Sequence, residues 1–81
     1  MEVLLEFKVQ RENKKTIRAQ EPISQIFQNQ YYKNFKTEKS QEKIMIGIVM
    51  DARDSKVIKE YEVLKYKGDG DIGDRSNWMR I

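Results

Sequence analysis

The stretch Lys43-Ile-Met-Ile-Gly-Ile-Val-Met50 decides the fold, because it is the longest apolar run in the 81-residue chain. Its apolar side chains fall on both alternating faces, which is typical of a central strand that is covered on both sides or paired on both edges. Gly47 interrupts the run and indicates a bulge or the close approach of another backbone. We therefore expect residues 43–50 to form the middle strand of a sheet.

The first ten residues predict a second strand. Apolar and mostly polar positions alternate there, with Val3, Leu5, Phe7 and Val9 on one side and Leu4, Glu6, Lys8 and Gln10 on the other. This period of two is typical of a half-buried strand. A polar break follows at residues 11–15, where Asn13 can adopt the positive φ that a hairpin turn needs. We expect residues 2–10 and 15–20 to form a hairpin.

A helix is predicted over residues 22–37. Pro22 suits the first turn of a helix, where its missing N–H costs nothing. Apolar side chains then recur at spacings of three and four residues as one stripe, made of Ile23, Ile26, Phe27, Tyr31 and Phe35. The polar segment 37–42 should end the helix.

The last third of the chain predicts one more strand and a tail. Residues 57–66 are rich in Val, Ile and Tyr and favour a strand. Its register stays open, because Tyr61 and Val63 share one face while the other holds Ile58, Leu64 and Tyr66. Three of the four glycines lie in residues 68–74, so we expect an irregular segment there.

Together these elements predict a small α+β domain that spans residues 1–81. One amphipathic helix should lie on an antiparallel sheet of about four strands, in the order β-β-α-β-β. The tail, residues 68–81, should dock on the body, because so small a domain needs every long apolar side chain in its core. Alternatively, the tail binds a protein partner through Trp78, Met79 and Arg80, since Trp, Met and Arg are enriched at interfaces.

The composition excludes several classes of site. The chain has no cysteine and no histidine, which rules out disulfides, the usual zinc sites and catalytic triads built on either residue. No stretch resembles a signal peptide or a membrane span, so we expect a cytoplasmic protein without a membrane partner.

Two acidic motifs suggest catalysis or metal binding, but each lacks the expected context. Asp54-Ser55-Lys56 matches the acidic-x-Lys element of metal-dependent nucleases, although it falls in a predicted turn. Asp69, Asp71 and Asp74 occupy a glycine-rich loop but miss the spacing of an EF-hand. We therefore expect no enzyme activity, cofactor or metal, and a nuclease is a remote alternative.

Basic side chains carry the first functional hypothesis. The chain has a formal charge of +3, and its basic residues gather on the predicted hairpin and the helix exit, where Tyr32 accompanies Arg11, Lys14, Lys15, Arg18, Lys33, Lys36 and Lys39. Lysine and arginine neutralise phosphates, and bases stack on aromatic rings. This pattern predicts a small intracellular accessory protein that binds DNA or RNA.

A protein partner is the second hypothesis. Acidic residues are interleaved with the basic ones, as on any solvated surface. The chain then acts as a protein-binding inhibitor or adaptor of the kind that phages and mobile elements encode. An open sheet also has edges that can pair, so a homodimer is a further expectation.

Overall fold

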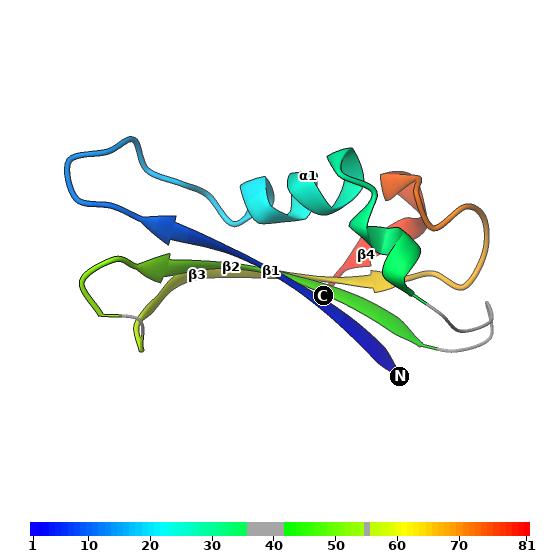
Figure 1. Ribbon diagram of the computed structural model, residues 1–81. Helices are drawn as coiled ribbons and strands as arrows, with labels where there is room; N and C mark the ends of the chain where they lie inside the picture. Colours follow the sequence, from blue (N-terminus) through cyan, green and yellow to red (C-terminus); the bar gives the residue numbers. More distant parts are fainter. Residues whose placement is uncertain (36–41, 55) are drawn as a thin grey trace.

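The computed structural model describes residues 1–35, 42–54 and 56–81 (Figure 1). They form one four-stranded sheet in the order β1-β2-β3-β4, crossed by a single α-helix. The elements are β1 (Glu2–Gln10), α1 (Gln20–Gln28), the 3-10 turn η1 (Tyr31–Asn34), β2 (Lys43–Asp51), β3 (Ile58–Tyr66), the 3-10 turn η2 (Arg75–Asn77) and β4 (Trp78–Arg80). The predicted small α+β class is confirmed, with a mixed sheet in place of an antiparallel one.

Strand β2 is the central strand that the apolar run predicted. It pairs with β1 in parallel along its whole length and with β3 in antiparallel fashion. Gly47 lies where α1 begins, and a Cβ atom there would come within 2.8 Å of the Ala19 carbonyl oxygen and 2.9 Å of Ile23 Cγ1. The close approach expected at Gly47 is therefore present, and it lets the helix lie directly on the middle of the sheet.

Residues 15–20 differ from the predicted second arm of a hairpin. Asn13 has the expected positive φ of 61°, but residues 15–18 pair with no described strand and α1 begins at Gln20. The side chain of Gln10 holds this segment instead, because its amide oxygen accepts a hydrogen bond from the Ile17 N–H at 2.6 Å. Parallel pairing explains the difference, since the chain must leave β1 and cross the sheet before it can enter β2. The fourth strand comes from the tail, as β4.

The predicted helix over residues 22–37 is divided into two pieces. Helix α1 ends at Gln28, Gln30 adopts a left-handed φ of 58°, and η1 follows. A left-handed residue cannot continue a right-handed helix, so the chain changes direction there. Residues 36 and 37 lie outside the described part. None of the described helices is long and apolar enough to cross a membrane.

Trp78 is the centre of an aromatic cluster that joins the tail to the helix and the sheet. Its ring lies 5.8 Å from that of Phe35, 6.4 Å from that of Phe27 and 5.4 Å from that of Tyr66. Only 6% of Trp78 is exposed, and its indole N–H donates to the Ile72 carbonyl oxygen at 2.8 Å. Trp78 thus anchors the tail to the hydrophobic core.

The two neighbours Trp78 and Met79 provide a matched test of this packing. We expect Trp78→Ala to lower the free energy of unfolding by about 3–5 kcal/mol, because it removes a large buried ring. Met79→Ala should cost less than about 1 kcal/mol in dilute solution, because half of Met79 is exposed. Urea unfolding followed by circular dichroism measures both, and equal losses would contradict the assignment of Trp78 to the core.

Candidate protein-binding face

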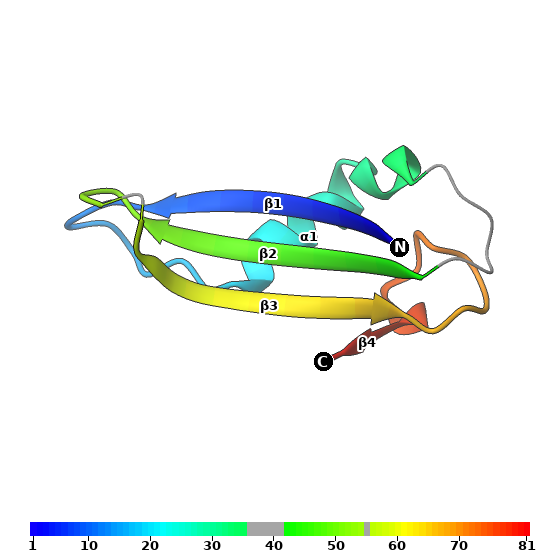
Figure 2. The same cartoon turned by 90° about the horizontal axis from the view of Figure 1, so that it is seen from below.

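The two faces of the sheet differ in what covers them. Figure 1 shows α1 and η1 on one side of the sheet, and no helix on the other side. Figure 2, the view from below, looks onto β1, β2 and β3 with α1 behind them. Within the described ranges, the helix layer covers one face of the sheet and leaves the other open.

Apolar side chains occupy the open side of all four strands. Strand alternation and register place on this side Val3, Leu5, Phe7, Val9, Ile44, Ile46, Ile48, Met50, Tyr61, Val63 and Met79. We call this set the open face. Lys65 shares it as its charged member and forms an ion pair with Glu42, with Nζ and Oε1 3.0 Å apart. The charge thus lies at one end of the strands and the centre is apolar.

Strand β1 reverses the usual arrangement, in which apolar side chains face the covered side of a sheet and polar side chains face water. The predicted alternation is confirmed, but the apolar residues Val3, Leu5, Phe7 and Val9 face away from the helix, and each is 46–48% exposed. Glu6 and Lys8 lie on the covered side instead. A half-exposed apolar row beside a covered polar one is costly in water unless another surface covers the apolar row.

The covered face also holds polar side chains on β2 and β3. Glu62 is only 6% exposed, and its Oε1 lies 3.5 Å from the Arg80 Nε. Lys43 is 2% exposed, and its Nζ lies 5.6 Å from the centre of the Tyr66 ring. These charged groups take core positions that apolar side chains usually hold, while apolar side chains of the same strands remain on the open face.

The open face extends along the full length of three strands. Strands β1, β2 and β3 have nine residues each. At a rise of about 3.3 Å per residue and a strand spacing of about 4.8 Å, they span about 400 Å² in projection. Exposed apolar patches of this size on single chains are often functional.

The residues predicted to bind nucleic acid do not form one surface. Arg11, Lys14 and Lys15 lie in the loop after β1, whereas Lys33 lies in η1, at the other end of the 42 Å long molecule (Figure 1). Arg18 pairs with Glu60 at 3.1 Å. Lys36 and Lys39 lie outside the described residues. The two predicted basic groups are therefore separate.

Tyr32 is not a free stacking platform for a base. Its ring lies 6.1 Å from that of Phe27, and it packs against the hydrophobic core. A Cβ atom on Gly73 would come within 2.8 Å of the Tyr32 hydroxyl oxygen, so the tail passes directly beside the ring. The aromatic side chain serves packing between η1 and the tail.

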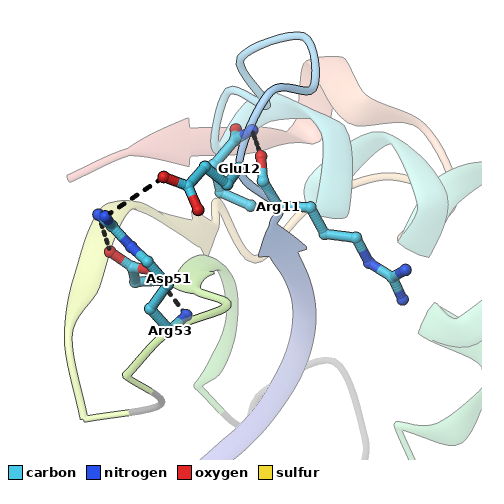
Figure 3. A network of polar contacts seen from close by, with 5 residues as sticks. Arg11, Glu12, Asp51 and Arg53 are labelled. Atoms are coloured by element: carbon cyan, nitrogen blue, oxygen red, sulfur yellow. Dashed lines mark hydrogen bonds and ion pairs between the residues drawn. The ribbon is translucent and has the colours of Figure 1, made fainter.

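The loop after β1 meets the turn after β2 in a network of both charge signs. Figure 3 shows Arg53 between Glu12 and Asp51, with the Arg11 side chain extending away from them. The distances from the Arg53 guanidinium are 3.8 Å to Glu12 and 3.4 Å to Asp51. Hydrogen bonds from the Arg53 N–H and guanidinium lower the pKa of Asp51.

A groove of about 410 Å³ lies between this loop and the start of β3. Its charged lining comprises Arg11, Glu12, Lys14, Asp51, Arg53, Lys59 and Glu60. The lining carries side chains of both charge signs, so it favours neither a phosphate nor a cation.

The acidic motifs serve as turn caps. Asp54 accepts a hydrogen bond from the Lys56 N–H at 3.0 Å, while the residue between them lies outside the described part. Asp71 and Asp74 likewise accept from the backbone N–H two positions ahead. The hydrogen bonds from Ser76 lower the pKa of Asp74. In the described ranges no group of three or more potential ligands is placed to hold a metal ion.

The tail residues named as an alternative protein-binding site are divided between the two faces. Trp78 is buried and cannot contact a partner without leaving the core. Arg80 lies on the covered side, beside Glu62. Met79 alone of the three belongs to the open face, where it lies opposite Lys65.

Comparison of the chain with protein-family models, with curated proteins and with solved structures finds no match. The functional argument therefore depends on the geometry of this chain. Of the surfaces described above, the open face is the one that combines size, continuity and uniform chemistry.

Sequence reasoning missed the open face, although a signal for it was present. The strands carry more apolar side chains than one covered face can bury. They are the apolar residues of β1, both apolar sets of β2, and the pair Tyr61 and Val63. One nine-residue helix can cover only one side of a sheet. The excess of apolar strand positions over what α1 can bury was the available signal.

The contact of Glu60 with the start of α1 predicts a pH dependence. The Ala19 N–H donates to Glu60 at 3.0 Å, and this bond, with the Arg18 guanidinium, lowers the pKa of Glu60 below its ordinary value of 4.5. A carboxylate with a lowered folded-state pKa stabilises the fold above its unfolded pKa, and that contribution is lost as the pH falls through the folded value.

We therefore expect Glu60→Gln to lower the urea midpoint at pH 7, and the difference from the parent protein to shrink towards pH 3. Glu21→Gln controls for the loss of one exposed carboxylate on α1. A difference that stays constant between pH 3 and pH 7 would show that the charge of Glu60 is not what stabilises the contact.

Proposed function

We propose that this protein acts by binding another protein through the open face of its sheet. One observation supports this most directly: all four strands place apolar side chains on the side that α1 does not cover. Burying apolar area at about 25 cal/mol per Å² is the main source of affinity in such contacts. Protein interfaces have an apolar centre with a polar rim, and Lys65 with Glu42 lies where a rim is expected.

Nucleic-acid binding receives less support from the geometry. Affinity for DNA or RNA depends on a continuous basic surface that neutralises phosphates. The basic residues of the loop after β1 and of η1 lie at opposite ends of the long axis. The Arg53 network also brings Glu12 and Asp51 next to the loop. We therefore rank protein binding above nucleic-acid binding, and both above catalysis.

Ile46 is the residue of choice for a test of the open face. It lies in the middle of β2, between Leu5 on β1 and Val63 on β3. Ile46→Lys places a charge at the centre of the face. Gln28→Lys is the matched control, because Gln28 is exposed at the end of α1 on the opposite side of the sheet.

The chain and both variants are immobilised and exposed to a lysate of the source cells, and each captured protein is then purified and titrated. We expect affinity to fall at least 30-fold in Ile46→Lys, as for a residue at the centre of an interface, and to be kept in Gln28→Lys. Circular dichroism checks that both variants fold. Equal binding by the parent and Ile46→Lys would contradict the proposal.

A triple variant tests nucleic acid as the alternative partner. It combines Arg11→Ala, Lys14→Ala and Lys15→Ala. Binding of DNA or RNA that depends on these residues, falls steeply with salt and survives Ile46→Lys would move the function to the basic loop.

A further inference from the structure

We infer that the partner on the open face is a second copy of this chain, so that two sheets pack face to face in a homodimer. This inference rests on the proposed function and names its partner. Three properties of the open face carry it, namely its charge, its shape and its area.

The charge of the open face permits contact with itself. A two-fold axis brings the same patch of both subunits together, so a charge near the axis meets its own copy. The middle of the face holds Ile46 and Ile48, with Phe7 and Tyr61 beside Ile48, and none of these side chains is charged. Lys65 lies opposite Ile44, near the start of β2, and is neutralised within its own subunit by Glu42. Two copies can therefore meet at the centre without repulsion.

The shape of the open face suits sheet-on-sheet packing. Strands β1, β2 and β3 are equal in length, and each contributes side chains at alternate positions. Sheets of this kind pack about 10 Å apart with their strands about 30° from parallel, and their side chains interdigitate. Isoleucine and valine next to Phe7 and Tyr61 provide the uneven surface that such interdigitation needs.

The area of the open face is sufficient for a stable dimer. A projection of about 400 Å², with the relief of the side chains and β4 added, gives an accessible area on the order of 600–800 Å² per subunit. Two subunits then bury on the order of 1,200–1,600 Å², the size of a standard interface. A second copy presents an open face of the same length and width.

The outer edge of β1 offers a different way for two copies to meet. In the described sheet β1 pairs only with β2, and an edge strand can pair with another chain. Edge pairing at β1 would leave the exposed parts of Ile46, Ile48 and Tyr61 uncovered, because β2 and β3 lie behind β1 in the sheet. Face-to-face packing covers them, and this is why we favour it.

Sedimentation velocity between about 1 and 100 μM tests the inference. The parent chain and Gln28→Lys should sediment at twice the 9.7 kDa subunit mass, and Ile46→Lys should be a monomer with a dissociation constant raised at least 100-fold. If circular dichroism shows that Ile46→Lys does not fold, Leu5→Lys replaces it, since Leu5 is half exposed.

The absence of cysteine allows a direct test of the packing geometry. Single variants Ile48→Cys and Gln28→Cys are treated with a bis-maleimide whose spacer is about 10 Å, the distance between packed sheets. We expect a cross-linked dimer from Ile48→Cys and none from Gln28→Cys. A dimer that survives Ile46→Lys and that Ile48→Cys does not cross-link would overturn the inference in favour of edge pairing.

Monomer at every concentration would also overturn the inference, and an apolar dye separates that result from failure of the proposed function. A monomer that binds the dye anilinonaphthalene sulfonate, and loses it in Ile46→Lys, keeps an open face for a different protein. A monomer whose dye binding is absent, or unchanged by Ile46→Lys, would contradict both the dimer and the proposed function.

Discussion

The parallel pairing of β1 with β2 is the constraint on which the rest of the structure depends. Two parallel neighbours cannot be joined by a tight turn, so residues 11–42 must carry the chain from one end of the sheet back to the other. The described part of that crossover, residues 11–35, contains α1 and passes over one side of the sheet. The glycine at position 47 lets the helix lie against β2, and the left-handed Gln30 then turns the chain towards Trp78. The crossover between β1 and β2 therefore produces both the covered core and the open face.

This division explains the unusual distribution of polar residues. The helix side of the sheet buries Lys43 and Glu62, yet each has a specific neighbour there, the Tyr66 ring for the lysine and Arg80 for the glutamate. Desolvating charged groups is costly, and such neighbours reduce the cost. The apolar residues of the same strands on the open face are only partly buried in the isolated chain. They become fully buried only when another surface covers the open face. The same side chains therefore contribute to the stability of the fold and to the affinity for a partner.

The position of most strands and of the helix could be predicted from local sequence patterns. The direction in which the strands pair could not. The apolar run at 43–50 predicted the central strand, Pro22 the start of the helix, and the alternation at 2–10 the first strand. Parallel pairing could not be read from the sequence, because β1 alternates in the same way whichever side is covered. That gap produced the error at residues 15–20, whereas the open face was missed because the apolar strand positions were not weighed against what one helix can bury. The helix break at Gln30 was also hidden, since the apolar stripe continues through Tyr31 to Phe35, and the contact of Phe35 with Trp78 exists only in the folded chain.

The long crossover also determines the order in which the chain can fold. Glu2 pairs with Lys43, so β1 must find a partner 41 positions away, whereas β2 and β3 are joined by a short turn. Closing a long loop lowers the conformational entropy of the chain before any stabilising contact forms. Local hairpins therefore form faster than pairs of strands that are distant in the sequence. We expect β2 and β3 to form an early hairpin whose outer edge stays vacant until β1 arrives. Synthesis delivers β1 first, so this strand stays unpaired until β2 has been made. The single parallel pair therefore makes completion of the sheet depend on the closure of one long loop.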